Sequence, residues 1–431
     1  MCVYFKCKMK YTRKKRHRQI NGEIIGETAG WKSVRIYGDP YERGFAHGYL
    51  LRHEIAKSAK SLTFLIKTFI KTTVAHYLQR CQTEIIPILQ NHYPELFREM
   101  QGISAGSAVR LVVIVGLNSF MSLYPNEDAV NRCSAFIATG NATEKGDIVM
   151  AHNTHADFIS GQQMNIVLRI EPTEGHTFVM QTAAGLVASS SDWFLCASGI
   201  IGCETTIAYT NYDPDFKHGH PYFCRIRKAM QYANTLDEYA ETMIQNNAGD
   251  YACSWQFGDT NTGEIMLLEL GLKIHNVQRT FDGVFYGMNS AMDFRLRNME
   301  TTDISHIDGT TSLGARNNRL NYLLNERYYG SINTTNAKRV LADHYDEMAA
   351  KNQMSSRNIC KHSEEDLDKL VGCTDGKVVN TKMAKSLRFY GRFGSSCGRT
   401  LDVSEYCKKH PTVKSWQPYL SDFIGCPWTK L

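Results

Sequence analysis

A strand, a polar turn and a second strand within residues 133–154 constrain the fold of this chain more than any other segment. The apolar run Ser134-Ala-Phe-Ile-Ala-Thr139 ends at a turn, and the chain returns as Asp147-Ile-Val-Met-Ala-His-Asn-Thr154. Two such runs joined by turn-forming residues predict a β-hairpin. The pairing would bring His152 and Asn153 back beside the beginning of the first strand.

Cys133 stands at the beginning of the first strand, directly after Arg132. If the peptide bond between them is cleaved, Cys133 gains an α-amino group with an ordinary pKa of about 7.7 to 8.0. Such an amine is suited to act as a general base near neutral pH. One residue would then supply both nucleophile and base. The alternative is a small core residue, because free cysteine is among the most buried residue types.

Helical spacing dominates before the hairpin and strand patterns dominate after it. A strand pair is expected within residues 23–37, and apolar residues recur at helical spacing within residues 41–123. Further strands are expected at residues 164–170, 176–181, 205–210 and 264–270, with a helix at residues 221–233. A capping box is expected at Thr235 and Glu238, and Asn336 is expected to cap another helix. The pattern predicts a sheet-rich middle flanked by helices.

The composition is that of an ordinary globular protein. The chain has 431 residues, of which 43% are hydrophobic and 21% charged, and no linker divides it. The net charge is +6, and basic residues gather in the first nineteen positions, at Lys8, Lys10, Arg13, Lys14, Lys15, Arg16 and Arg18. This tail is interpreted either as a disordered, solvated terminus or as a peripheral contact with anionic membrane. No nucleic-acid partner is expected.

The cysteines and the targeting signals leave the compartment open. Thirteen cysteines include no Cys-x-x-Cys pair and no zinc-ligand spacing, so neither a metal nor another cofactor is expected. In an oxidising compartment, disulfides could form among the late cysteines Cys360, Cys373, Cys397, Cys407 and Cys426. Asn141-Ala-Thr and Asn333-Thr-Thr match the glycosylation acceptor pattern. No secretory signal is visible, and the longest apolar run is too short to span a bilayer.

The hairpin resembles the phospholipase B-like family of N-terminal-nucleophile hydrolases, through Cys-Ser-Ala-Phe at residues 133–136 and Ala-His-Asn-Thr at residues 151–154. Later landmarks of that family are matched in the same order, at residues 198–200, 204–206, 286–289, 315–316, 374–378, 384–386 and 394–398. Residues 41–51 and 102–106 are similar to the related acyl-coenzyme A:6-aminopenicillanic acid acyltransferase family. Those acyltransferases carry arginine and aspartate where this chain has His152 and His155, which favours the phospholipase B-like branch.

The resemblance implies an α+β fold, a four-layer αββα N-terminal-nucleophile hydrolase sandwich. Residues 1–19 would be the basic tail, residues 20–132 a mainly helical part that resembles a pro-segment, and residues 133–431 the catalytic αββα part. After cleavage, the pieces would remain one globular domain. The resemblance also implies a lysosomal or secreted protein, although no signal peptide is visible.

The resemblance implies roles for several residues. Cleavage would fall between Arg132 and Cys133, and the Cys133 thiolate would then attack an ester or amide carbonyl. His152 would hold the new amine and the nucleophile, and Asn289 would donate to the oxyanion. Thr206 joins the catalytic group. The expected substrate contacts are Asn153, Thr205 and Arg316.

Each of these residues also has a structural interpretation. His152 suits a hydrogen-bonded core position, Asn289 a turn, and the two threonines a strand. Arg316 has a rival in Arg319, and a solvated surface position would suit either.

The sequence therefore predicts an autoprocessed hydrolase that cleaves acyl ester or amide bonds in a lipid or an N-acyl small molecule, with phospholipids favoured. The alternatives are an N-acyl amidase or acyltransferase, and a non-enzymatic lipid-binding protein that keeps the fold. The enzymatic interpretation requires Cys133, His152 and Asn289 to lie around one cleft.

Overall fold

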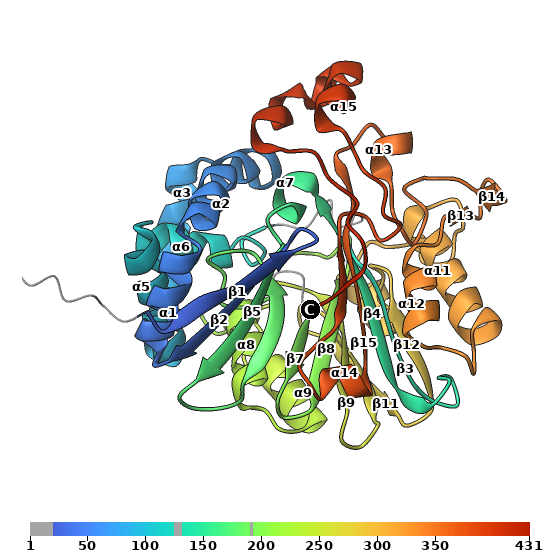
Figure 1. Ribbon diagram of the computed structural model, residues 1–431, viewed down its shortest axis with the longest axis horizontal. Coiled ribbons are helices and arrows are strands. Elements are labelled where there is room, and N and C mark those ends of the chain that lie inside the picture. Colours follow the sequence, from blue (N-terminus) through green and yellow to red (C-terminus); the bar gives the residue numbers. More distant parts are fainter. Residues whose placement is uncertain (1–19, 125–131, 190–192) are drawn as a thin grey trace, which may run out of the picture.

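The structure, a computed structural model, describes residues 20–124, 132–189 and 193–431 (Figure 1). It is a mixed α/β structure with two large sheets and many helices, compatible with an α+β sandwich. The basic tail expected at residues 1–19 lies outside the described residues. Within them, no helix is long and apolar enough to cross a bilayer.

The larger sheet has nine strands in the order β1-β2-β5-β6-β7-β8-β9-β10-β11. Their bounds are β1 Gly22–Thr28, β2 Trp31–Gly38, β5 Ile166–Pro172, β6 Phe178–Thr182, β7 Phe194–Cys196, β8 Ile200–Thr206, β9 Cys253–Asp259, β10 Ile265–Leu270 and β11 His275–Thr280. Neighbours pair antiparallel except β2 and β5, which are parallel. The β2–β5 pair therefore joins a strand before Cys133 to a strand after it.

The second sheet has six antiparallel strands in the order β12-β3-β4-β15-β16-β17. Their bounds are β12 Gly283–Gly287, β3 Ser134–Gly140, β4 Gly146–Asp157, β15 Val371–Asn380, β16 Tyr390–Phe393 and β17 Thr429–Lys430. A small separate pair consists of β13 Tyr345–Asp346 and β14 Lys351–Asn352. The hairpin expected from the sequence lies in the middle of the second sheet, as β3 and β4.

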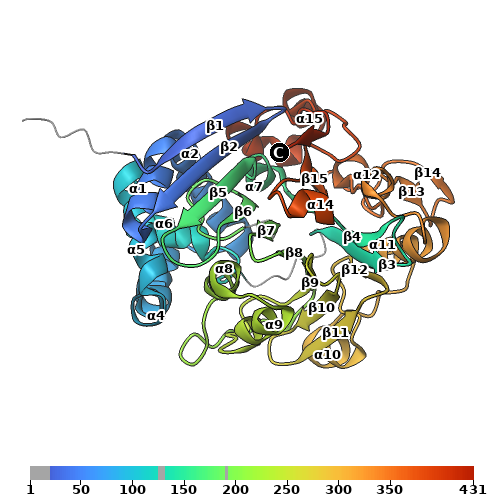
Figure 2. The same cartoon turned by 60° about the horizontal axis from the view of Figure 1, so that its bottom comes forward.

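Helices flank both sheets (Figure 1). The helices before Cys133 are α1 Pro40–Leu50, α2 Arg52–Leu65, α3 Val74–Arg80, α4 Ile86–His92, α5 Pro94–Ser107 and α6 Leu111–Asn118. The later ones are α7 Phe158–Gly161, α8 Tyr222–Tyr232, α9 Leu236–Ile244, α10 Phe294–Glu300, α11 Ser312–Tyr322, α12 Thr334–Leu341, α13 Ser363–Asp366, α14 Thr381–Ala384 and α15 Val403–Lys409. Figure 2 shows β3, β4, α11 and α12 together on one side of the molecule, away from β5.

Three apolar clusters hold these elements together. The largest joins the nine-stranded sheet to α1, α2, α5, α6, α8 and α9, with Ile55, Ile103 and Trp255 among its buried members. A second cluster lies between the two sheets, where Ile137 of β3 and Leu195 of β7 contribute. A third joins β3 and β4 to α11 and α12. The burial of these apolar faces is the main force that stabilises the arrangement.

Glycines explain why residues 41–51 and 102–106 stand out in the sequence. They lie on α1 and α5, whose backbones touch directly. A Cβ atom added at Gly44 would sit 2.1 Å from the Glu99 carbonyl oxygen, and one at Gly102 would sit 2.3 Å from that of Tyr41. These segments are therefore packing surfaces between two helices.

Most elements expected from the sequence are confirmed, with two corrections. The strand expected at residues 205–210 runs instead from Ile200 to Thr206. Asn336 does not cap a helix as expected, because the cap of α12 is Asn333, whose side chain accepts from two backbone amides. Thr235 caps α9 as expected, and Glu238 reaches back to the amide of Asn234. None of the eleven cysteines in the described part, the five late ones included, forms a disulfide.

Candidate active site

The β3–β4 register sets the directions of the candidate side chains. Ala135 lies opposite His152, and Ser134 lies opposite Asn153. Because side chains alternate along a strand, His152 and Asn153 point to opposite faces of the sheet. His152 Nε2 lies 3.0 Å from the Glu204 carbonyl oxygen in β8, between the sheets. The register confirms the hairpin and separates these two side chains.

Asn153 anchors the outer face of the sheet. Its amide nitrogen donates to the carbonyl oxygens of Leu341, at 2.8 Å, and Ile359, at 3.1 Å. Leu341 is the last residue of α12, and Ile359 lies in the chain that follows this helix. In this geometry Asn153 holds backbone in place, and its expected contact with substrate stays a prediction.

Cys133 is buried, with 5% of its surface exposed, and immediately precedes β3. Arg316 of α11 donates through Nη1 to the Cys133 carbonyl oxygen at 3.0 Å and to the Ser134 hydroxyl at 3.1 Å. Burial lowers the pKa of Arg316 to about 9, although Cys133 opposes the shift. The guanidinium therefore fixes the backbone on the carboxyl side of Cys133.

The same guanidinium reaches Asn289. Arg316 Nη2 donates to Asn289 Oδ1 at 3.0 Å, and Asn289 Nδ2 donates to the Thr206 carbonyl oxygen at 2.8 Å. Asn289 has a φ of 82°, a left-handed conformation that asparagine tolerates better than most residues. One buried network thus joins the backbone of Cys133, through Arg316, to Asn289 and Thr206. The oxyanion role expected of Asn289 stays a prediction.

The two threonines have different surroundings. Thr206 Oγ1 lies 2.5 Å from the Tyr251 hydroxyl, which in turn donates to Glu204 Oε1 at 2.9 Å. Thr205 packs against Gly287 of β12, where an added Cβ atom would sit 2.2 Å from the Thr205 hydroxyl oxygen. Thr206 is therefore part of a hydrogen-bonded network, whereas Thr205 fits closely against the neighbouring sheet.

His155 occupies a position that the sequence analysis did not assign to the site. Its Nδ1 atom is hydrogen bonded to the carbonyl oxygen of Arg132, and its Nε2 atom lies 3.0 Å from the carbonyl oxygen of Ile359. Burial, together with the charge of Arg316, holds the pKa of His155 well below its ordinary value. The ring is therefore neutral, and its single N–H faces two carbonyl acceptors.

In the sequence, His155 stands where the related acyltransferases carry aspartate, three residues after His152. Residues three apart on a strand point to opposite faces, so this position gives no reason to expect His155 beside His152. The two rings do point to opposite faces, yet the outward ring of His155 reaches the Arg132 carbonyl.

A buried charged network lies beside His152. On β15, Lys377 is opposite His152 and Asp375 is opposite Thr154. Lys377 Nζ lies 2.5 Å from Asp375 Oδ1 and 2.6 Å from Thr154 Oγ1. Burial, reinforced by Lys377, holds the pKa of His152 well below its ordinary value, so this imidazole is also neutral.

Two cavities adjoin Arg132. Arg132, Asp157 and Phe120 line both of them. One has a volume of about 240 Å³ and includes Tyr124 and Trp416, and the other has a volume of about 100 Å³. The smaller cavity is lined largely by apolar side chains: Leu62, Leu65, Leu117, Met121, Met164 and Leu186. The helices before Cys133 thus form part of the walls beside the candidate cleavage point.

Comparisons with known proteins find distant relatives. The chain is 25% identical to an acyl-coenzyme A:6-aminopenicillanic-acid-acyltransferase 40 kDa form of Emericella nidulans, over 49% of this chain and 56% of that protein. It is 24% identical to protein dcd1A of Dictyostelium discoideum, over 53% of this chain and 56% of that protein. An uncharacterized protein of Archaeoglobus fulgidus is 25% identical over 50% of this chain and 39% of that protein.

The chain thus spans about half the length, or less, of these relatives. No model of a known protein family matches it. The similarity to this acyltransferase is distant. The similarity does not extend to a phospholipase specificity, which stays a prediction.

Proposed function

We propose that this chain is an autoprocessed enzyme with an N-terminal cysteine nucleophile, which transfers acyl groups from esters or amides to water or another acceptor. The observation that carries the proposal is the pair of contacts around the Arg132–Cys133 bond. His155 is hydrogen bonded to the carbonyl before the bond, and Arg316 donates to the carbonyl after it. The two contacts fix a carbonyl group on each side of the nucleophile.

Self-cleavage would proceed as an acyl shift. The Cys133 thiol attacks the carbonyl carbon of Arg132, its proton moves to the backbone nitrogen of Cys133, and the C–N bond breaks as a thioester forms. Water then hydrolyses the thioester and releases the Arg132 carboxylate, the thiol and the α-amine of Cys133. The N–H of His155 donates to the Arg132 oxygen as negative charge develops there.

Turnover would repeat this chemistry on an external carbonyl. The new α-amine of Cys133 is the base, and the substrate carbonyl takes the position that the Arg132 carbonyl had. Asn289 is the proposed oxyanion donor, and Thr206 is the other proposed member of the catalytic group. A hydrogen-bonded network joins both residues to Arg316. Arg316, whose donors reach backbone and side chains of the protein itself, is proposed as a positioning residue.

The cavities beside Arg132 favour an acyl substrate. The apolar walls of the smaller cavity suit a hydrocarbon chain, and the larger one also contains Asp368 and Lys369. We therefore propose a lipid or an N-acyl small molecule as substrate, with the apolar chain beside Phe120. Among these substrates we favour a phospholipid, because the hairpin resembles that of the phospholipase B-like family.

The layering of the elements supports the same class of enzyme. Helices α1 to α6, the two facing sheets, and α11 with α12 follow one another across the molecule (Figure 1). We propose that this order is the αββα sandwich of N-terminal-nucleophile hydrolases.

Trapping of the acyl intermediate tests this function. The processed protein is incubated with short-chain p-nitrophenyl esters and with N-acyl amines, quenched with acid, and analysed by peptide mass spectrometry. We expect an acyl group on Cys133 and multiple turnovers in the wild type, and neither in Cys133→Ser. Substrate binding without acylation at any pH would favour the lipid-binding alternative.

A further inference from the structure

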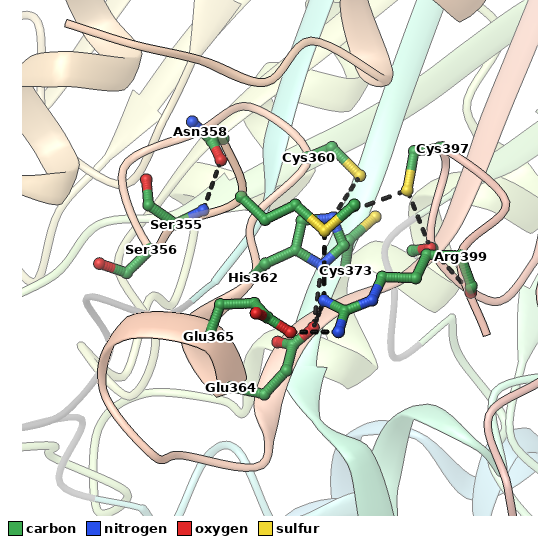
Figure 3. Close-up of polar contacts among 12 residues, drawn as sticks. Ser355, Ser356, Asn358, Cys360, His362, Glu364, Glu365, Cys373, Cys397 and Arg399 are labelled. Atoms are coloured by element: carbon green, nitrogen blue, oxygen red, sulfur yellow. Dashed lines mark hydrogen bonds and ion pairs between the residues drawn. The ribbon is translucent and has the colours of Figure 1, made fainter. Parts of the chain in front are cut away.

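Four metal-ligating side chains meet outside the candidate active site. His344 follows α12, Cys360 and His362 precede α13, and Cys397 follows β16. Their ligand atoms, two imidazole nitrogens and two sulfurs, all lie within 4.8 Å of one another. Figure 3 shows Cys360, His362 and Cys397 turned toward one another. Three loops that are distant in sequence thus supply one compact group.

The separations of these atoms fit a tetrahedron around one ion. His362 Nε2 lies 3.2 Å from His344 Nε2, 3.4 Å from Cys360 Sγ and 3.6 Å from Cys397 Sγ. Zinc bonds of about 2.3 Å to sulfur and about 2.0 to 2.1 Å to nitrogen place tetrahedral ligand atoms about 3.3 to 3.8 Å apart. The three separations lie within about 0.2 Å of that range.

Hydrogen bonds orient His362 toward the other three side chains of the cluster. His362 Nδ1 lies 2.9 Å from Glu364 Oε1, and Arg399 also contacts this carboxylate, at 3.3 Å. With Nδ1 directed at Glu364, the ring turns Nε2 toward three neighbours at once, and in a neutral imidazole this atom carries the lone pair that binds a metal ion. A cation satisfies that lone pair together with the two thiolates. Carboxylates commonly orient metal-binding histidines in this way.

We propose that His344, Cys360, His362 and Cys397 bind one Zn²⁺ ion in a closed structural site. Two sulfur and two imidazole ligands in tetrahedral positions favour zinc. Four protein ligands leave no position for a reacting water, so the site is structural rather than catalytic. Binding converts the two thiols to thiolates and releases their two protons. The ligand spacing that the sequence analysis sought is absent because three loops supply the ligands.

The proposed ion would also steady the candidate active site. Ile359, next to the ligand Cys360, accepts from Asn153 at 3.1 Å and lies 3.0 Å from His155 Nε2. Ser396, next to the ligand Cys397, donates to the Leu341 carbonyl oxygen at 2.7 Å. Loss of the ion would therefore loosen the backbone that holds His155. This consequence rests on the proposed function, whereas metal binding itself does not.

Metal analysis of the intact chain tests the site. The protein is purified under reducing conditions, supplied with excess zinc, passed through a desalting column and analysed by plasma mass spectrometry. We expect about one zinc ion per chain in the wild type and in Cys426→Ser, a half-buried cysteine outside the cluster. Cys397→Ser and His344→Ala should each weaken zinc binding at least about tenfold.

Cobalt binding is measured on the wild type, so this test does not depend on whether the variants fold. We expect the visible bands of tetrahedral Co²⁺ together with a thiolate-to-cobalt charge-transfer band in the near ultraviolet. Wild-type protein that retains no zinc and gives no thiolate band would overturn the proposal. A disulfide that joins Cys360 to Cys397 or Cys373 in the folded protein, found by peptide mapping, would also overturn it. Failure of self-cleavage in zinc-loaded protein would count against the proposed function alone.

Discussion

His155 Nδ1 is hydrogen bonded to the carbonyl oxygen of Arg132, the group that the Cys133 thiol would attack during self-cleavage. The neutral ring has one N–H and faces a second carbonyl, that of Ile359, through Nε2. Negative charge that develops on the Arg132 oxygen would favour the form of His155 with its hydrogen on Nδ1, because Nδ1 then donates to this oxygen. Among the described side chains, His155 is therefore placed to donate to the first tetrahedral intermediate of the proposed self-cleavage.

Removal of this donor should slow self-cleavage. We expect His155→Ala to cleave about 10² to 10³ times more slowly than the wild type, the usual effect of the loss of one oxyanion donor. The measurement is the rate of fragment formation on denaturing gels. His220→Gln is the control, because that histidine contacts Tyr93 in another part of the molecule. Cleavage of His155→Ala at the wild-type rate would show that His155 takes no part in self-cleavage.

Arg316 and Arg319 lie on the same helix and allow a matched comparison. Arg316→Lys loses the planar fork that reaches the Cys133 carbonyl and Asn289 together, which should cost about 1 to 3 kcal/mol in the free energy of unfolding. Arg319→Lys keeps a charge beside Asp343 and should lose less. Urea unfolding of both variants, made in a Cys133→Ala background to keep the chain intact, measures the difference. Equal losses would contradict the positioning role of Arg316.

The hairpin was predictable from sequence because it depends on local alternation. The apolar runs on either side of the turn gave β3 and β4, and hence the placing of His152 and Asn153. The role of His155 was not predictable, since its partners, Arg132 and Ile359, are brought to it by tertiary packing.

Three further features depend on chain segments that are distant in sequence. The strand pairing that places Lys377 beside His152 joins residues more than two hundred positions apart. The contact of α1 with α5 at Gly44 and Gly102 depends on how the helices cross. The cluster around His362 depends on three loops. None of these leaves a periodic signal in the sequence.

Gly102 tests whether the α1–α5 contact is structural. Gly102→Ala forces a Cβ atom against the Tyr41 carbonyl and should lower the free energy of unfolding by about 1 to 3 kcal/mol. Gly26→Ala is the control, because an added Cβ there meets nothing within 4 Å. Urea unfolding, again in a Cys133→Ala background, measures both. An unchanged stability in Gly102→Ala would show that the helices can separate without cost.

His47 should make stability depend on pH. Its Nε2 accepts from the Gly185 amide at 2.9 Å, and burial, opposed by Glu99, lowers its pKa from 6.5 to about 4. Between these values the unfolded chain takes up a proton that the folded chain refuses, so stability falls as the pH falls below 6.5. The loss approaches about 1.4 kcal/mol per pH unit.

A comparison of the wild type with His47→Gln isolates this effect. The variant has no titrating ring at that position, so its stability should fall less steeply between pH 6.5 and about 4. Urea unfolding across this pH range measures the two slopes. Parallel slopes would mean that His47 is not the group responsible.

Intact mass measurement with N-terminal sequencing tests the central claim most directly. Purified wild-type protein, incubated at acidic and neutral pH, should separate under denaturing conditions into residues 1–132 and 133–431, and the second piece should begin with Cys133. Cys133→Ala should stay whole. Recovery of a fully active wild-type enzyme that remains a single chain would contradict the account, because a nitrogen in a peptide bond cannot serve as the base.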